Sequence, residues 1–251
     1  TWEEYTWGEV GDMARRLASG LKSLNLREGA HIGIYSKNCR EWIISDLAIV
    51  MAGYISVPFF PSLNGKELSY IMDYGDVDAL FIGKIETWDD IKNDLPSEMP
   101  IIRFPKYEGC SNVTKGHEWH EFINSHEPIE NPHQPKLSDL GTIIFTSGTT
   151  GNPKGVMLTY QAIDGIKVVL DDPNNPLGIK HTGNNDFISY LPLNHIFERV
   201  VIEWCSFRYG GTISFVESIE TFGQNLKEAQ PHVFAAAPRV WTKLQMGILS
   251  K

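Results

Sequence analysis

Apolar runs of strand length alternate with helical patterns along most of this 251-residue chain. His31 to Tyr35 and Ile55 to Phe59 are predicted strands, and Arg40 to Met51 between them is a predicted helix. Consecutive parallel strands need a crossover connection, which is usually a helix. The alternation therefore predicts an α/β fold with mostly parallel sheets that are flanked by helices on both faces.

Capping signals and proline positions locate the remaining elements. Further strands are expected at residues 79–82, 101–104, 142–145, 187–191, 212–216 and 233–236, and further helices at 159–170 and 195–209. Helix starts are expected where a capping residue is followed three positions later by Glu or Gln, at Thr6 with Glu9, Asn64 with Glu67 and Thr221 with Gln224. Pro238 suits a first helical position, because the N–H that proline lacks is unpaired there in any case.

A proline-rich segment predicts the division into subdomains. Glu127 to Lys136 holds Pro128, Pro132 and Pro135, which suit neither a helix nor a central strand. We therefore expect an N-terminal α/β subdomain at residues 1–127, a linker at 128–136 and a second α/β subdomain at 137–251.

Composition excludes some classes of partner. The net charge of −9 argues against a nucleic-acid binder, which usually carries a basic surface. Cys39, Cys110 and Cys205 show no CxxC spacing, which favours a reducing, cytoplasmic location and neither disulfides nor a zinc site. The histidines of His117 to His120 are one residue short of the zincin spacing, so we expect ordinary helix residues there.

Membrane insertion of these residues is not expected. The most apolar stretch, Leu47 to Phe60, is shorter than the roughly 20 residues that a spanning helix needs. The chain begins at Thr1 without an initiator methionine, so an anchor upstream stays open.

The segment from Thr146 to Gly155 carries the clearest chemical signal. It follows a predicted strand and supplies hydroxyls, glycines and Lys154, in the order Thr-Ser-Gly-Thr-Thr-Gly-Asn-Pro-Lys-Gly. Glycines let the backbone approach a ligand closely, and hydroxyl and N–H groups donate to phosphate oxygens. Pro153 rules out the GxxxxGK[ST] pattern of P-loop enzymes. A plain surface loop is the alternative, but the order and placement favour a site for nucleotide phosphates.

Three segments together give the chain a family resemblance. Residues 142–158 resemble the phosphate-binding signature of the adenylate-forming (AMP-binding) superfamily, and residues 191–200 and 237–243 resemble long-chain acyl-CoA synthetases. Shorter matches at residues 5–9, 35–38, 41–42 and 57–58 extend the likeness over the chain, which resembles an N-terminal fragment of such an enzyme. The resemblance implies a long-chain fatty-acid–CoA ligase that forms an acyl-adenylate from ATP, releases pyrophosphate, and then forms acyl-CoA with release of AMP.

The resemblance also assigns site residues. It implies ATP binding by Thr146, Ser147, Gly148, Thr149, Thr150, Gly151 and Lys154, with Thr146 as the contact of Mg²⁺. It places His195 and Lys154 in catalytic roles, and His195, Arg199 and Arg239 at the acyl substrate. Coenzyme A is the second substrate. A fatty substrate makes peripheral contact with a membrane a reasonable expectation, whereas the oligomeric state is not readable from the sequence.

Position in the predicted fold supports one shared site. The phosphate segment, His195 and Arg239 each follow a predicted strand, and ligands of open parallel sheets bind at the carboxyl ends of strands. A histidine at a helix N-terminus is held neutral by the helix dipole and can donate to a carboxylate or phosphate oxygen. The alternatives are a ring satisfied by the backbone for His195, and an exposed i,i+4 pair with Glu203 for Arg199. We expect Trp204 and Phe207 to be core residues.

Some relatives carry a gating tryptophan at the position of Arg199, so the gate is uncertain in this chain. The family's later motifs, among them the Tyr-Gly-x-Thr-Glu and Thr-Gly-Asp segments and the C-terminal catalytic lysine, have no counterpart up to Lys251. We therefore expect residues 1–251 alone to bind ATP weakly and not to turn over. Two alternatives stay open, namely a ligase for aryl or other carboxylic acids and a non-catalytic nucleotide-binding module.

Overall fold

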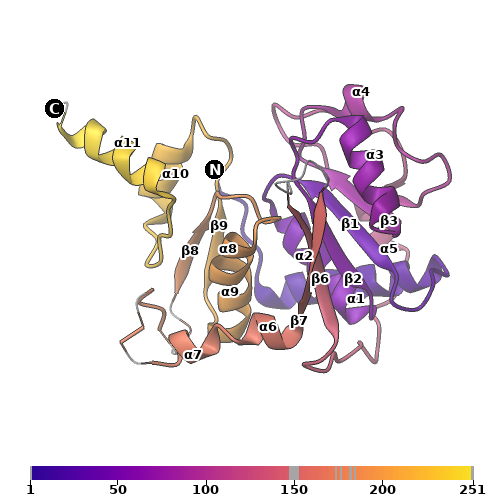
Figure 1. Cartoon of the computed structure of the whole chain (residues 1–251), viewed down its shortest axis with the longest axis horizontal. Coiled ribbons are helices and arrows are strands. Elements are labelled where there is room, and N and C mark those ends of the chain that lie inside the picture. The colour runs from indigo at the N-terminus through magenta and orange to yellow at the C-terminus, as the bar shows by residue number, and fades with distance from the viewer. Residues whose placement is uncertain are drawn as a thin grey trace. The chain divides into compact units, whose positions relative to one another are not determined.

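The computed structural model describes residues 2–146, 153–172, 174–175, 177–180, 183 and 185–249. It divides into two compact units, Thr1–Gly165 and Ile166–Lys251 (Figure 1).

The first unit contains most of the strands. Its elements are α1 (Trp7–Ser23), β1 (His31–Ser36), α2 (Arg40–Met51), β2 (Ile55–Phe59), α3 (Gly65–Tyr74), β3 (Val77–Gly83), α4 (Trp88–Ile91), β4 (Ile101–Arg103), β5 (His117–Glu118), α5 (Trp119–Asn124), β6 (Leu140–Thr146), β7 (Lys154–Thr159) and α6 (Tyr160–Asp164).

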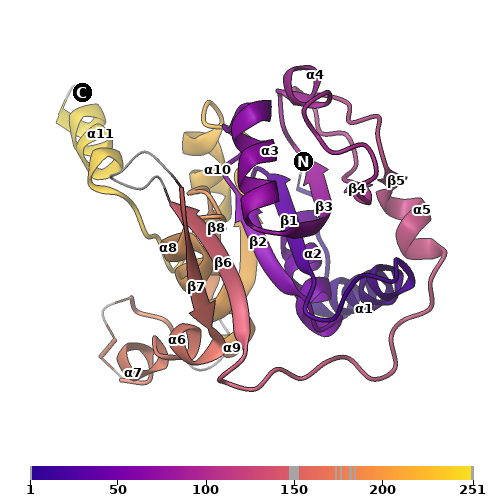
Figure 2. The same ribbon diagram turned by 45° about the vertical axis from the view of Figure 1, so that its right-hand side comes forward.

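One mixed sheet organises this unit. The strand order is β5-β4-β3-β1-β2-β6-β7, and every neighbouring pair is parallel except β6 with β7. Helix α1 packs against both α2 and α5, while α3 and α4 contribute to a core cluster that also contains Phe59 and Phe145 (Figure 2). The central strands β1 and β3 are buried almost throughout, as expected for strands covered on both faces. The predicted α/β class with a mostly parallel sheet is confirmed.

Local signals located several helices correctly. The capping boxes of Thr6 with Glu9 and of Asn64 with Glu67 are both formed. Thr221 lies at the N-cap of α10 (Phe222–Ala229), but its side chain makes no capping hydrogen bond. Its single O–H lies within donating distance of the backbone oxygen of Ser218 at 3.2 Å and of Asn225 Oδ1 at 3.0 Å. The start of the helix was right, and the predicted cap was wrong.

The predicted helix at 159–170 is present as two short helices, and the residues before it form a strand that was not predicted. Residues Lys154–Thr159 form β7, which pairs antiparallel with β6 along its whole length. Thr159 then caps the short helix α6, accepting a hydrogen bond from the Ala162 N–H at 3.3 Å. A second short helix, α7 (Lys167–Leu170), follows after a turn. Pairing with β6 satisfies the backbone groups of β7. The residues of β7 alone do not reveal this pairing.

The boundary between the two compact units does not fall at the proline-rich segment 128–136. Ser56 of β2 pairs with Thr142 of β6, and the Thr142 hydroxyl donates to the Ser56 backbone oxygen at 2.8 Å. The segment itself is tied to the first unit, because the His133 N–H donates to the Met51 oxygen at 2.8 Å. Strands β6 and β7 therefore complete the first sheet, and the division lies between Gly165 and Ile166.

The histidines of residues 117–120 do not all lie in a helix. His117 and Glu118 form β5, and α5 begins at Trp119. Across the described ranges, no group of three or more His, Cys, Asp or Glu side chains could hold a metal ion.

The second unit is built on two parallel strands. Its elements are α7, β8 (Asp186–Ser189), α8 (Ile196–Glu198), the π-helix η1 (Arg199–Trp204), α9 (Cys205–Tyr209), β9 (Thr212–Phe215), α10 and α11 (Pro238–Leu249). Segments α8, η1 and α9 run on without interruption, and Pro238 is the first residue of α11 as predicted. The predicted strand at 233–236 is reduced to a single bridge between Val233 and Phe187. Val233 and Phe187 belong to the core of this unit.

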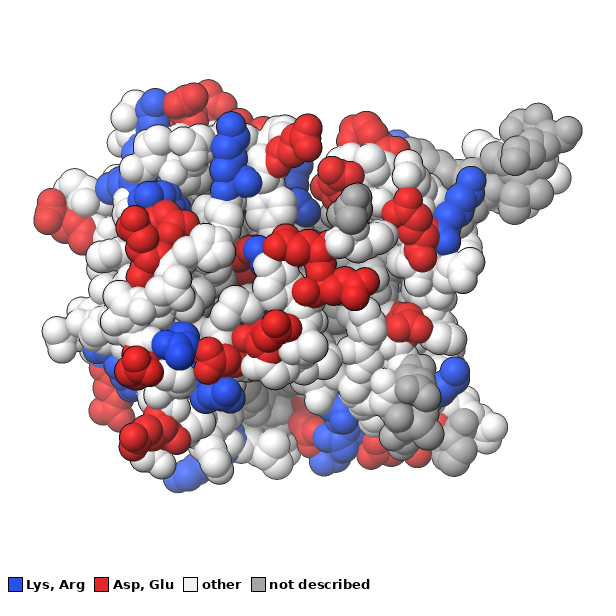
Figure 3. Space-filling model, turned by 180° about the vertical axis from the view of Figure 1, so that it is seen from behind, with Lys and Arg blue, Asp and Glu red and all other residues white. Residues whose placement is uncertain are grey.

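The charged surface agrees with the acidic composition. On the face drawn in Figure 3, acidic and basic side chains are interspersed over the described residues and form no continuous basic stripe. None of the helices in the described part of the chain is both long and apolar enough to cross a membrane.

Candidate functional site

The phosphate segment is bracketed by two residues that face each other across the sheet. Thr146, the last residue of β6, is the register partner of Lys154, the first residue of β7. Both side chains are exposed. Ser147, Gly148, Thr149, Thr150 and Gly151 lie outside the described residues. The strand pair therefore places a hydroxyl and an ammonium group at the two ends of the predicted phosphate-binding segment.

Lys154 is a strand residue, whereas the sequence placed it in a loop that leads to a helix. Its neighbour Gly155 is the partner of Phe145, and a Cβ at position 155 would lie 3.0 Å from Cγ2 of Ile143 and 3.2 Å from Cε1 of Phe145. The Phe145 ring stacks on Phe59, with ring centroids 6.4 Å apart. Glycine at 155 thus permits a close approach that fixes the register of Lys154.

His195 caps the helical run that begins with α8. Its Nδ1 accepts a hydrogen bond from the Phe197 N–H at 3.2 Å, and its side chain is exposed. An accepting Nδ1 carries no proton, so the neutral ring keeps its proton on Nε2, which can donate to a ligand. The backbone thus satisfies one nitrogen of the His195 ring, as the alternative interpretation held, and the Nε2–H remains available as a donor.

Glu198 is a buried acid that was not among the predicted site residues. Its side chain is 1% exposed, and its Oε1 accepts hydrogen bonds from Ser189 Oγ at 2.9 Å and from the Tyr190 N–H at 3.0 Å. Burial raises the pKa of Glu198 to about 8, and hydrogen bonds from Ser189 and from the backbone of Tyr190 and Leu191 oppose this rise. The spacing His195-x-x-Glu198 at a predicted helix start is the signal that could have drawn attention to it.

Arg199 forms the predicted pair with Glu203, but the pair is not exposed. Arg199 Nε lies 3.0 Å from Glu203 Oε2, and the two side chains are 2% and 0% exposed. The guanidinium also lies 5.2 Å from the ring centroid of Trp204. Arg199 and Glu203 both lie in the π-helical turn η1, and π-helical turns are often found at functional sites. Phe207 is exposed rather than in the core, and Trp204 is half-buried.

Arg239 lies in the first turn of α11 and is exposed. Trp241, also exposed, meets Phe234 edge to face with ring centroids 5.2 Å apart. His195, Arg199 and Arg239 belong to the second unit, whereas Thr146 and Lys154 belong to the first. Their convergence in one site stays a prediction.

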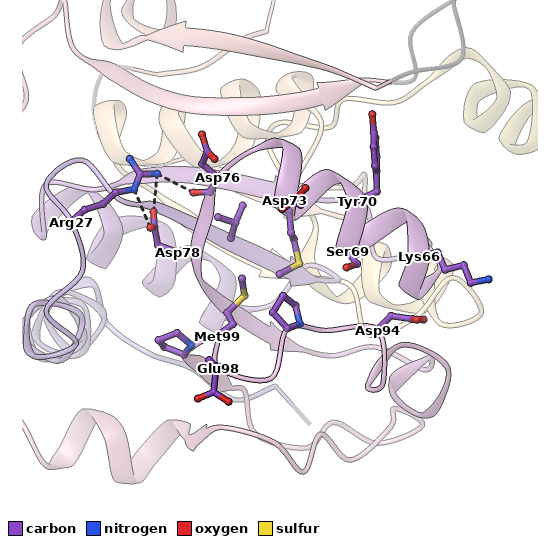
Figure 4. Close-up of a pocket in the computed structure, with 14 residues that line it drawn as sticks. Arg27, Lys66, Ser69, Tyr70, Asp73, Asp76, Asp78, Asp94, Glu98 and Met99 are labelled. Atoms are coloured by element: carbon purple, nitrogen blue, oxygen red, sulfur yellow. Dashed lines mark hydrogen bonds and ion pairs between the residues drawn. The ribbon is translucent and has the colours of Figure 1, made fainter.

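A separate pocket of the first unit has the wrong charge for a polyphosphate. It lies beside α3 and the amino end of β3 (Figure 4). Its acidic lining residues are Asp73, Asp76, Asp78, Asp94 and Glu98, against the basic Arg27 and Lys66. Arg27 is itself engaged, since its Nε donates to Asp78 Oδ1 at 3.0 Å and its Nη2 to the Asp76 backbone oxygen at 2.9 Å. Thr146 lies at the carboxyl end of β6, so we do not assign this pocket to the nucleotide.

Comparison with known proteins identifies the family of this α/β fold. The family model described as AMP-binding enzyme matches residues 1–250, so the chain belongs to the AMP-binding enzyme family. It is 34% identical to a long chain acyl-CoA synthetase of Arabidopsis thaliana, over 98% of this chain and 38% of that protein. It is 28% identical to a long-chain-fatty-acid–CoA ligase of Rattus norvegicus, over 97% of this chain and 38% of that protein.

Solved structures share the fold. The o-succinylbenzoate CoA synthetase of Bacillus subtilis superposes with a TM-score of 0.74 at 18% identity, covering 97% of this chain and 58% of that one. An anthranilate CoA ligase superposes with a TM-score of 0.72 at 19% identity, covering 91% of this chain and 44% of that one. The chain spans 38% of the length of the curated relatives quoted above.

Proposed function

We propose that this chain contributes the nucleotide-facing part of an acid–thiol ligase that activates a long-chain fatty acid with ATP. The reaction joins AMP to the fatty carboxylate with release of pyrophosphate, after which coenzyme A displaces AMP to give the thioester. The observation that carries the proposal is that Thr146 and Lys154 are register partners and lie opposite each other on β6 and β7. The names of the curated relatives support the choice of acid.

The first unit supplies the phosphate contacts in this proposal. Lys154 would balance the charge of the β- and γ-phosphates, and the segment from Ser147 to Gly151 would donate hydrogen bonds. Thr146 offers one neutral oxygen ligand at the carboxyl end of β6. A single hydroxyl fits Mg²⁺ that takes its other ligands from phosphates and water, and a bound Mg²⁺ would neutralise the pyrophosphate leaving group.

The second unit would receive the acid. His195 offers its Nε2–H as a neutral donor toward a carboxylate oxygen. Arg199 is engaged with Glu203 and Trp204, so we assign it to the wall of the acyl site. Arg239 is exposed and can approach a substrate or phosphate oxygen directly. Peripheral contact with a membrane surface, from which fatty acids are drawn, is part of the proposal.

The test is fatty-acid-dependent exchange of pyrophosphate into ATP by the full-length protein, with Lys154→Ala as the variant. We expect Lys154→Ala to lower kcat/KM by about 10²- to 10³-fold, the range found when one transition-state donor is lost. Lys106→Ala, which removes another exposed lysine of the first unit, is the matched control and should leave the rate unchanged. Equal rates for both variants would contradict the proposal. Residues 1–251 alone should show only background exchange.

A panel of acids separates the alternatives. Relatives of the same fold include anthranilate and benzoate CoA ligases, so aryl acids are the main competing substrates. Palmitate, laurate, benzoate and anthranilate are compared by kcat/KM. Preference for an aryl acid would replace the fatty substrate, and ATP binding without exchange for any acid would favour a nucleotide-binding module.

A further inference from the structure

The corner between β8 and α8 buries two polar side chains that each leave one atom without a hydrogen-bond partner in the structure. Asn194 is 2% exposed with Nδ2 unpaired, and Glu198 is 1% exposed with Oε2 unpaired. Asn194 immediately precedes the N-cap residue His195, and Glu198 lies three positions after it. Buried polar atoms are nearly always paired, so two at one corner call for an explanation.

Glu198 does not serve as an ordinary capping acid. An acid at this position commonly accepts from the N-cap N–H, but the His195 N–H donates to the Pro192 oxygen at 2.9 Å. Glu198 Oε1 is held instead by Ser189 and Tyr190 at the end of β8. One carboxyl oxygen is thus fixed on the strand, and the other has no capping role.

The two unpaired atoms of this corner can both carry protons and act as donors. Asn194 Nδ2 carries two protons. Since Oε1 already accepts two hydrogen bonds, a proton on Glu198 belongs on Oε2, and burial keeps that proton in place at neutral pH by raising the pKa to about 8. A carboxylic acid kept neutral by its surroundings can donate to an oxyanion.

The charged and titratable neighbours leave this pattern intact. Burial and then the charge of Glu198 raise the pKa of Tyr190 to about 12, so its hydroxyl stays neutral, and it donates to the Ala235 oxygen at 3.0 Å. Arg199 is paired with Glu203, and His195 Nδ1 accepts from the Phe197 N–H.

We propose that Asn194 and Glu198 form an oxyanion-binding corner, in which the amide N–H and the carboxyl O–H donate to one oxygen of an anionic group. The group is a substrate carboxylate or a nucleotide phosphate, and this choice rests on the proposed function. Both atoms are enclosed, so the turn of residues 191–195 must move to admit the anion. Two unpaired polar groups destabilise the closed turn and favour that movement.

The test follows the side-chain amide signals of Asn194 by NMR in the intact protein, with calorimetry for affinity. The probes are laurate, 1-dodecanol as its neutral counterpart, and inorganic pyrophosphate. We expect Asn194 to shift with one of the two anions and not with the alcohol. A shift with laurate would identify a substrate carboxylate as the occupant, and a shift with pyrophosphate would identify a nucleotide phosphate.

Two isosteric variants make the test specific. Asn194→Asp replaces a donor by a negative charge and should weaken binding of the anion by about tenfold or more, or about 1.4 kcal/mol. Asn225→Asp is the matched control, because the Asn225 Oδ1 already acts as an acceptor for the Glu217 N–H and the Thr221 hydroxyl. It should change affinity less than about twofold, a difference of under about 0.4 kcal/mol.

The dependence on pH supplies a second readout. If laurate is the occupant, its affinity for the wild type should fall as pH rises through the pKa of Glu198, because the carboxylate then repels the anion. Glu198→Gln keeps an N–H donor and cannot titrate, so its affinity should stay level. If pyrophosphate is the occupant, the same contrast between wild type and Glu198→Gln is measured with pyrophosphate.

The inference and the proposed function can fail separately. An Asn194 signal that no anion shifts, together with equal anion affinity of Asn194→Asp and wild type, would overturn the oxyanion corner even in an active ligase. A shifted Asn194 in a protein without exchange activity would leave the corner standing and remove the ligase.

Discussion

Gly155 lies opposite Phe145 in the antiparallel pair of β6 and β7, and a Cβ at position 155 would approach the Phe145 ring to 3.2 Å. Phe145 cannot retreat freely, because it also packs against Phe59 and Tyr74. The glycine that ends the phosphate segment therefore has a packing role in addition to any contact with nucleotide.

We predict that Gly155→Ala destabilises the first unit by about 1–3 kcal/mol through overpacking against Phe145. Urea unfolding followed by fluorescence measures the change. Gly223→Ala is the matched control, because a Cβ there meets nothing within 4 Å and Gly223 lies in α10. That control should be neutral or stabilising by up to about 1 kcal/mol. A Gly155→Ala protein as stable as the wild type would show that the strands can separate slightly at no cost.

Capping at the start of α1 supports a second prediction. The Thr6 hydroxyl accepts from the Glu9 N–H at 3.2 Å, and Glu9 Oε2 accepts from the Thr6 N–H at 2.7 Å. Thr6→Ala should therefore cost about 1 kcal/mol of unfolding free energy. Thr6→Ser, which keeps the hydroxyl, should recover most of this loss in the same urea titration. A serine variant as unstable as the alanine variant would point to lost methyl packing instead.

These two predictions show which features the sequence could reveal. The Thr6 capping box is contained in four consecutive residues, so its pattern is complete in the sequence. Strand β7 was missed because its state depends on pairing with β6 across the phosphate segment. The division at Gly165 was missed because the proline-rich segment looks like a linker, although the His133 N–H ties it to α2. The burial of Arg199 and Glu198 arises from packing that no short window encodes.

The Arg199–Glu203 pair gives a third prediction. Removing one partner leaves a buried charge without compensation, so Arg199→Ala should destabilise the protein by about 3–5 kcal/mol. Replacing both partners by apolar side chains, as Arg199→Met with Glu203→Leu, should cost far less. A double-mutant cycle in urea measures the coupling. Additive effects of the two single changes would show that the pair contributes little beyond packing.

The last prediction concerns the pH dependence of stability. Burial raises the pKa of Glu198 from 4.5 to about 8 in the folded protein. Below the unfolded-state pKa, both states carry the proton and stability is highest. Between the two values the unfolded state releases its proton more readily, so stability falls as pH rises and levels off above the folded pKa.

Glu198→Gln should remove this slope, which amounts to a few kcal/mol between about pH 5 and pH 8. Unfolding free energies from urea titrations across this range are compared with those of Glu217→Gln, an exposed glutamate of the same unit. The control should keep the wild-type slope, so other titrating groups cancel in the comparison. Parallel curves for wild type and Glu198→Gln would mean that the Glu198 carboxyl is already ionised in the folded state, and the donor pattern of the corner would then be lost as well.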